Sequence, residues 1–277
     1  MTSEALPTLK HSKAPLLLFS DYHMHPQGHR VQRYTPQLLQ PWAHSARRLG
    51  LTDIAFTDHD RYHAGVDFDE IDRLRERNPD VRVRAGIELD NDPVHSPAGR
   101  KWIEKNWNRL DFVLGSVHFL ERANQMFDSV PDGAAQFEAR NVDEIYADYF
   151  RRLRELIATG LVDSVAHLDL IKIHGHRPTA DIGTLVNETL ECIRARNLAI
   201  ELSTAGWRKP VKELYPSDSI IELALDKGIP FTTASDAHSH VQLGENYANL
   251  AHKMAEIGIR QVSIFEKHKR ADVSLQL

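Results

Sequence analysis

The stretch LLLFSDYHMHPQGH, residues 16–29, begins with four apolar residues and continues into a polar run that holds three histidines. The apolar run predicts a buried β-strand. Because His23 and His25 are two residues apart, both side chains point to the same face of such a strand. Alone, a His-x-His pair is more often incidental than catalytic. Its meaning therefore depends on whether the other strands of the chain end in the same way.

Short apolar runs recur along the chain, and most are followed by a longer segment with helical spacing. Asp181 and Ser217 are expected to cap two of the predicted helices. The predicted strands are 16–24, 52–59, 81–89, 111–119, 163–170, 198–205 and 230–236, with a weaker eighth at 261–267. The predicted helices are 35–50, 142–160, 181–197, 217–228 and 243–258.

This alternation indicates parallel strands joined by crossover helices, and seven or eight such units favour a (β/α) barrel. An open doubly wound sheet is the second architecture, but no G-x-G-x-x-G follows the first strand. The chain shows no internal repeat and no convincing linker. We therefore expect one α/β domain over residues 16–277, preceded by a mobile tail at residues 1–15.

The composition is that of an ordinary globular protein, with 277 residues, 42% hydrophobic and 26% charged. A net charge of −5 offers no basic field for nucleic acid. Since Cys192 is the single cysteine, no internal disulfide can form, and a reducing cytoplasm is expected. No apolar run approaches the roughly 20 residues of a membrane helix. The sequence is compatible with a homo-oligomer.

Polar residues gather where the predicted strands end. In a parallel barrel all of these ends meet on one face, where the active sites of such enzymes lie. Residues far apart in the sequence would therefore converge in space. In chain order they are Asp21, His23, His25, Asp58, His59, Glu88, Asp90, Ser116, His118, His167, Asp169, Glu201, Ser203, Asp236 and His238.

Imidazoles and carboxylates together form a mixed nitrogen and oxygen donor set that suits Zn, Fe or Mn. There are more such ligands than one tetrahedral ion can use, so more than one metal ion is expected. Each residue also has a structural interpretation, such as Asp58 as a helix cap, or His118 and His167 as buried neutral side chains. The second His-x-His, at His174 and His176, flanks a glycine and is expected in a substrate loop or in solvent.

Six motifs carry a family resemblance. In chain order DYHMH, FTDHD, GIELD, GSVH, HLDLIK and SDAH resemble the polymerase and histidinol phosphatase (PHP) family, over a span from Phe19 to Lys267. The segments DFVLGSVHFL and VAHLDLIKIHG are similar to its histidinol-phosphate phosphatase branch. The resemblance implies a distorted (β/α)₇ TIM-like barrel, with a centre of two or three divalent metal ions at the C-terminal ends of the strands.

The resemblance also implies which residues hold each metal. His23, His25, Glu88 and Asp236 would hold the first metal, and Glu88, His118 and His167 the second. His29, His59 and His238 would hold a third. The chain departs from the family in two places. The loop after His25 reads PQGH, shorter and without the cysteine common in this branch, and Ser203 stands where an asparagine is usual.

The chemistry implied is hydrolysis of a small phosphate monoester, L-histidinol phosphate, to L-histidinol and phosphate by a metal-bridged hydroxide. Glu88, His118 and Asp236 are the expected catalytic residues. The expected substrate-binding residues are Lys172, Arg208, Lys209 and Ser203. Asp236, Asp21 or a metal-bound water could protonate the leaving group. The cationic amine and the imidazole of the substrate could contact Asp90, Asp92 or Glu201.

Three other interpretations stay open. A phosphodiesterase or 3′–5′ exonuclease of the same family would keep the metals, but the acidic charge balance favours no nucleic-acid partner. An amidohydrolase-type barrel acting on C–N bonds would place a lysine where His118 stands. A metal-binding or regulatory protein with an inactive site would be expected to have lost some of the ligands. The partner that fits best is therefore a small phosphate ester, with neither nucleic acid nor membrane.

Overall fold

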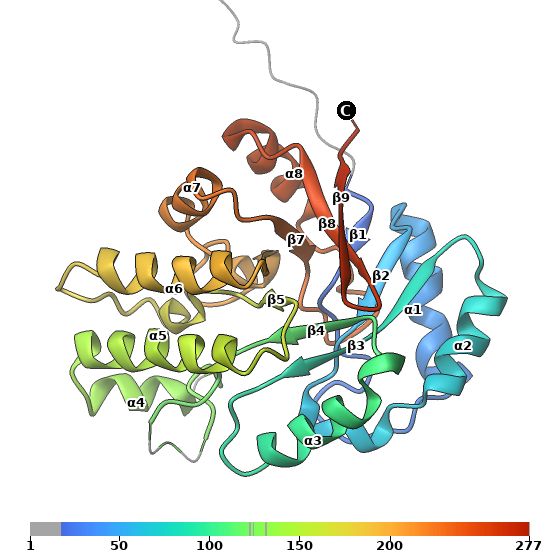
Figure 1. Cartoon of the computed structure of the whole chain (residues 1–277), viewed down its shortest axis with the longest axis horizontal. Helices are drawn as coiled ribbons and strands as arrows, with labels where there is room; N and C mark the ends of the chain where they lie inside the picture. The colour runs from blue at the N-terminus through green and yellow to red at the C-terminus, as the bar shows by residue number, and fades with distance from the viewer. Residues whose placement is uncertain (1–17, 122, 124, 131, 277) are drawn as a thin grey trace, which may run out of the picture.

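The computed structural model describes residues 18–276 except 122, 124 and 131 (Figure 1). The tail predicted at residues 1–15 lies outside the described residues. None of the helices in the described part of the chain combines the length and the apolar character needed to cross a bilayer.

Seven parallel strands form one sheet in the order of the sequence, as predicted. Beyond β1, Tyr22 N donates to Thr233 O at 2.9 Å and His25 N donates to Ala237 O at 2.8 Å, so the first and last strands also meet. The sheet therefore closes on itself as a seven-stranded barrel. Its strands are β1 (Ser20–Asp21), β2 (Asp53–Phe56), β3 (Arg82–Leu89), β4 (Phe112–Gly115), β5 (Ser164–Val165), β6 (Ala199–Ser203) and β7 (Phe231–Ala234).

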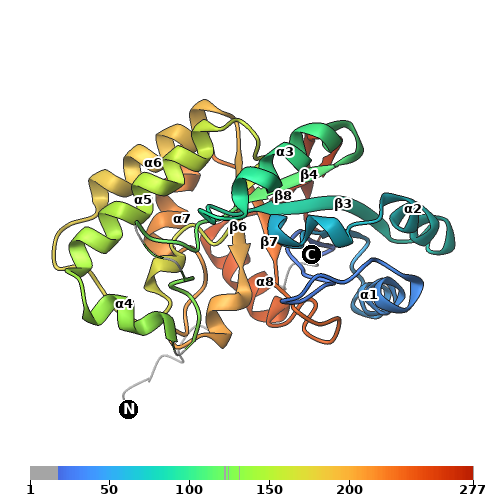
Figure 2. The same cartoon turned by 90° about the horizontal axis from the view of Figure 1, so that it is seen from below.

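Helices surround the barrel, with α5 and α6 packed side by side on one flank and α1 and α2 on the opposite flank (Figure 2). The α-helices are α1 (Pro36–Leu49), α2 (Phe68–Arg77), α3 (Ser96–Asn106), α4 (Ala135–Glu138), α5 (Val142–Ala158), α6 (Gly183–Ala195), α7 (Asp218–Asp226) and α8 (Tyr247–Ile257). Short 3₁₀ turns cover Asp60–Gly65, Trp107–Arg109, Asp132–Ala134, Leu170–Lys172 and Thr204–Arg208.

The five predicted helices are confirmed as α1, α5, α6, α7 and α8, whereas α2, α3 and α4 were not predicted. Ser217 occupies the N-cap position of α7, as expected, but its hydroxyl makes no capping hydrogen bond in the described structure. Asp181 lies one residue before the N-cap of α6, but its carboxylate accepts a hydrogen bond from Gly183 N at 2.8 Å. Gly50 ends α1 in the left-handed conformation, with φ of 75°, which a glycine adopts without steric cost.

The predicted eighth strand does not join the barrel. Strand β8 (Gln261–Glu266) pairs in antiparallel fashion with β9 (Lys269–Ser274), and this hairpin lies beside β7 (Figure 1). At its tip, His268 N donates to the carbonyl of Asp111, just before β4. The Phe265 ring packs 5.0 Å from the ring of Phe112. The hairpin therefore covers the N-terminal end of the barrel, opposite the predicted site.

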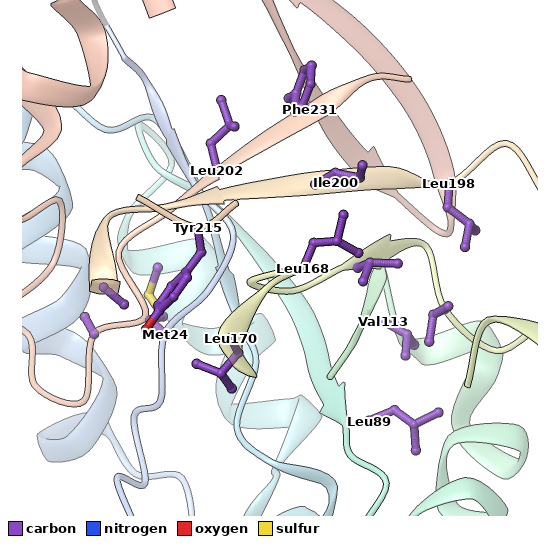
Figure 3. Packing of buried hydrophobic residues seen from close by; sticks show 14 of the residues in the cluster. Met24, Leu89, Val113, Leu168, Leu170, Leu198, Ile200, Leu202, Tyr215 and Phe231 are labelled. Atoms are coloured by element: carbon purple, nitrogen blue, oxygen red, sulfur yellow. The ribbon is translucent and has the colours of Figure 1, made fainter. Parts of the chain in front are cut away.

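Alternation along the strands separates two hydrophobic clusters. On β6, Ile200 and Leu202 point outward into the large cluster beneath the helices, which Figure 3 shows. Ala199 belongs instead to a smaller cluster inside the barrel, together with Tyr22 and Phe112. Because side chains alternate along a strand, Glu201 shares the inward face with Ala199. Buried carboxylates near the strand ends are therefore directed toward the mouth of the barrel.

Candidate metal centre

A cavity of about 600 Å³ opens at the C-terminal ends of the strands. Eight of the nine predicted metal ligands line it, and the remaining one, His23, lies buried directly beneath. The structure therefore brings together residues that are spread over more than 200 positions of the chain. The lining residues are His25, His29, His59, Glu88, His118, Met126, Asp128, Ser129, Val130, His167, Leu170, Arg208, Lys209, Asp236, His238 and Gln242.

The first predicted donor set is assembled around the histidine pair that follows the first strand. His23 Nε2 and His25 Nε2 lie 3.0 Å apart, although β1 already ends at Asp21. Asp236 Oδ1 lies 3.2 Å from His25 Nε2 and 3.7 Å from His23 Nε2. Since the two imidazole nitrogens and the carboxylate oxygen converge, a single cation between them would contact all three.

Glu88 stands between the first two predicted sets. Its Oε2 lies 3.5 Å from His23 Nε2 and 3.6 Å from His25 Nε2. Its Oε1 lies 3.5 Å from His167 Nε2 and 3.8 Å from His118 Nε2. One carboxylate therefore presents a different oxygen to each pair of imidazoles, which is the arrangement of a ligand that bridges two metal ions.

The third predicted set is less compact. His25, His59 and His238 form a group whose donor atoms all lie within 4.8 Å of one another. The exposed His29 stacks on His238, with ring centroids 4.4 Å apart, but it is not a member of that group. His59 Nδ1 lies 2.8 Å from Glu88 Oε2. His59 thus links the third set to the carboxylate of Glu88, and His29 lies at the rim of that set.

Buried carboxylates hold the outer nitrogens of two histidines. Glu201 Oε2 lies 2.8 Å from His23 Nδ1, and Asp90 Oδ2 lies 3.0 Å from His118 Nδ1. Asp90 is also paired with Arg61. Such partners fix the tautomer and orientation of an imidazole that binds metal, and here they direct both Nε2 atoms toward Glu88.

The acids expected to receive the substrate amine are therefore engaged elsewhere. Glu201 pairs with His23 and Asp90 pairs with His118, as described above. Asp92 accepts a hydrogen bond from Val94 N at 2.8 Å and pairs with His95 at 2.9 Å. In the described part of the chain these three acids are not among the residues that line the cavity.

The charges of the cluster shift the acid–base equilibria of its members. Burial alone would raise the pKa of Glu88 and of Asp236, but the surrounding histidines hold both well below their usual range. Burial and the neighbouring histidines lower the pKa of His25. For His118, burial is outweighed by the carboxylates of Asp90 and Asp128, and the pKa rises to about 10. Glu88 and Asp236 are therefore anionic at neutral pH, as carboxylate ligands of a metal need to be.

Two site residues have backbone conformations that non-glycine residues rarely adopt. Asp236 has φ of 51° and His167 has φ of 24°. Each such residue costs on the order of 1–3 kcal/mol and persists where the surrounding structure imposes it, most often at functional sites. Both side chains line the cavity, so the strained backbone serves to direct them into it.

The donor set fits divalent metal ions. Both carboxylate oxygens of Glu88 are buried and lack a hydrogen bond within the described structure, although imidazole nitrogens lie 2.8–3.8 Å away. A buried anion without hydrogen bonds is costly, and metal coordination relieves that cost. Histidine nitrogens with carboxylate oxygens are the ligands of Zn, Fe and Mn.

Two of the four expected substrate-binding residues lie at the cavity. Arg208 and Lys209 line it. Arg208 Nη2 donates to the carbonyls of Ser235 and Asp236, at 2.7 and 3.1 Å, which leaves Nη1 buried and without a partner in the described part of the chain. Arg208 is thus fixed beside a candidate metal ligand with one donor to spare.

The other two expected substrate-binding residues lie elsewhere. Lys172 is buried and lines a second cavity, where Nζ contacts Asp169 at 2.9 Å and Glu213 at 3.1 Å. Ser203 is buried at the end of β6, where its hydroxyl accepts a hydrogen bond from Ala205 N at 3.4 Å. Their polar groups are occupied within the fold, so we do not assign them to substrate.

Asp21 and Asp58, at the ends of β1 and β2, also have structural partners. Asp21 Oδ1 accepts a hydrogen bond from Ser235 N at 3.1 Å, and burial raises the pKa of its carboxyl to about 6. Asp58 accepts hydrogen bonds from Tyr34 OH at 2.6 Å and from Gln27 N at 2.9 Å. The Asp58 contacts tie the loop after β1 to the barrel, whereas the Asp21 contact joins β1 to the residue after β7. Neither residue lines the cavity among the described residues.

Several lining residues were not predicted. Met126, Asp128, Ser129 and Val130 come from the long loop after β4, and Gln242 comes from the loop after β7. The ends of the predicted strands do not indicate these residues, because they lie ten or more residues past β4 and eight past β7.

This chain is similar in sequence to proteins of one family. The family model described as PHP domain matches residues 21–205. A protein of Deinococcus radiodurans named "Probable histidinol-phosphatase" is 31% identical over 268 residues, covering 90% of this chain and 97% of that protein. The histidinol-phosphatase of Lactococcus lactis is 25% identical over 236 residues, covering 79% of this chain and 83% of that protein.

A solved structure shows the same fold. The histidinol phosphate phosphatase of Lactococcus lactis, crystallised with Zn, L-histidinol and phosphate, superposes with a TM-score of 0.66. It is 18% identical to this chain and covers 91% of it, while the match takes in 98% of that protein. The expected single-domain barrel is therefore confirmed by a related architecture.

Proposed function

This chain belongs to the PHP domain family, and on that premise we propose that it is a metal-dependent phosphatase that hydrolyses L-histidinol phosphate to L-histidinol and phosphate. The observation that carries the proposal is the bridging position of Glu88, with one oxygen toward His23 and His25 and the other toward His118 and His167. The names of the relatives and the ligands of the Lactococcus lactis structure support the choice of substrate.

The metal ligands follow the donor sets. His23, His25, Glu88 and Asp236 would hold one divalent ion, and Glu88, His118 and His167 a second. His29, His59 and His238 would hold a third. Zn, Fe and Mn all accept these ligands. When bound, such ions neutralise charge on the phosphoryl group and lower the pKa of a coordinated water.

The side chains of the protein position this chemistry. Glu201 and Asp90 hold the outer nitrogens of His23 and His118, so that the inner nitrogens stay directed at Glu88. The free Nη1 of Arg208 would donate to a phosphoryl oxygen, and the Lys209 ammonium would add a second positive charge. Glu88, His118 and Asp236 are the proposed catalytic residues, because they would hold the metals that contact the reacting atoms.

The experiment is steady-state phosphate release by protein loaded with Zn or Mn. We expect kcat/KM for L-histidinol phosphate to exceed that for other phosphomonoesters and for a phosphodiester by at least tenfold. Faster turnover of the diester would favour the phosphodiesterase alternative and overturn the substrate assignment. A cytoplasmic location, expected from the single cysteine, stays a prediction.

A further inference from the structure

Asp128 lines the cavity but belongs to none of the candidate metal groups. Its Oδ2 lies 4.0 Å from His118 Nε2. Its Oδ1 is buried and has no hydrogen-bond partner in the part of the chain that the structure describes. Glu88 and Asp236, the other carboxylates among the described lining residues, both face the histidines of the donor sets. Among the described lining residues, Asp128 is therefore the one carboxylate that belongs to none of the candidate donor groups.

The position of Asp128 is fixed by the residue before it. Phe127 N donates to His118 O at 2.9 Å, and His174 Nε2 lies 2.8 Å from Phe127 O. The Phe127 ring is fully buried and packs edge-on against Tyr149, with centroids 5.7 Å apart. The loop also passes close to Gly133, where an added Cβ would lie 1.9 Å from Phe127 O. The carboxylate is thus built into the wall of the cavity.

The cavity is lined by basic side chains and by a carboxylate outside the donor groups, so it can bind both an anionic and a cationic part of a substrate. Arg208 and Lys209, with the metals, suit the anionic phosphoryl group. A carboxylate with an unpaired buried oxygen suits a cation, because a charged hydrogen bond would compensate its burial. A monoester that carries an ammonium group on its alcohol portion would satisfy both ends at once.

We propose that Asp128 binds the ammonium group on the alcohol portion of the substrate and so selects aminoalkyl phosphates over neutral phosphate esters. This inference rests on the proposed phosphatase activity. It assigns the recognition of the amine to the loop after β4, in place of Asp90, Asp92 and Glu201. His174, expected in a substrate loop or in solvent, is a positioning residue for that loop through its contact with Phe127 O.

The test uses two esters of nearly the same shape. In 2-aminoethyl phosphate a terminal ammonium replaces the terminal methyl of propyl phosphate. The metal-loaded full-length protein is compared as wild type, Asp128→Asn and Asp132→Asn. Asp132 is an exposed acid of the same loop region and is not among the described lining residues, so its variant is the matched control. Bound metal is counted in each sample.

In Asp128→Asn we expect kcat/KM for 2-aminoethyl phosphate and for L-histidinol phosphate to fall about tenfold to a hundredfold. For propyl phosphate it should change less than twofold, with metal content unchanged. Asp132→Asn should match the wild type on all three esters. An equal loss on propyl phosphate, a loss of metal, or no loss on the two ammonium esters would overturn the proposal.

The proposed function is judged separately. Its failure would be seen in the wild type alone, as weak turnover of L-histidinol phosphate beside the other esters. The role of Asp128 is judged from the ratio of the rates on 2-aminoethyl and propyl phosphate, variant against wild type.

Discussion

Replacing Glu201 by Gln tests whether the metal centre depends on its supporting carboxylates. Glu201 is fully buried, with Oε2 at 2.8 Å from His23 Nδ1 and Oε1 at 3.2 Å from His167 N. It therefore supports one candidate ligand of each of the first two metals. Gln keeps the size of the side chain but has one carbonyl oxygen and no charge, so it cannot accept both hydrogen bonds. Loss of such a partner typically costs 10- to 100-fold in metal affinity, which is about 1.4–2.7 kcal/mol.

Competition between the protein and a chelator for Zn measures this change. The control is Glu191→Gln on the outer surface of α6, where Glu191 pairs only with Arg194 and Lys227 among the described residues. We expect Glu201→Gln to weaken Zn binding and phosphate release together, while the control matches the wild type. Unchanged Zn affinity in a folded Glu201→Gln protein would refute the supporting role of this carboxylate.

Four further results are expected. His118→Ala should abolish phosphate release and reduce bound metal, with the circular dichroism spectrum unchanged; a wild-type rate would contradict its assignment. The pKa of His118 is raised to about 10, so a metal ion must displace the imidazole proton at neutral pH. Zn affinity measured by calorimetry should therefore rise between pH 6.5 and 8.5. An affinity that does not change with pH would contradict this. Arg208→Ala should raise the KM for L-histidinol phosphate about tenfold without loss of metal. Lys212 is exposed and lies outside the described cavity lining, so Lys212→Ala should leave KM unchanged. Phe265→Ala should lower the free energy of unfolding, measured in urea, by about 3–5 kcal/mol, because it leaves a cavity in the small hydrophobic cluster inside the barrel. A loss under about 1 kcal/mol would mean that the hairpin contributes little to stability.

Most of the candidate site could be predicted from the ends of the strands. Parallel strands in a barrel place their C-terminal ends on one face, so His23, Glu88, His118, His167 and Asp236 converge once the strands are located. The fold followed from the same alternation of apolar runs and helical segments. The role of each ligand could not be derived from that pattern alone, because it depends on which carboxylate oxygen faces which imidazole.

Other features depend on contacts that no local pattern reveals. Helix α2 was not predicted because its sequence, FDEIDRLRER, is mostly charged, although Phe68, Ile71 and Leu74 form a buried apolar stripe. The apolar run of β8 was correctly read as a strand, but its partner β9 is largely polar and exposed. Lys172 follows β5 as expected, yet a 3₁₀ turn brings it to Asp169 and away from the metal cavity. Asp128 reaches the site only because a long loop folds back onto the carbonyl of His118.

The most direct measurement of the central claim is a metal titration of chelator-treated protein, followed by phosphate release from L-histidinol phosphate. If Glu88 bridges two ions, turnover should be absent without metal and should require at least two equivalents of Zn or Mn per chain. Glu88→Gln should bind fewer equivalents and stay inactive at saturation. Full turnover in the chelated protein, or wild-type stoichiometry and rate in Glu88→Gln, would contradict the account.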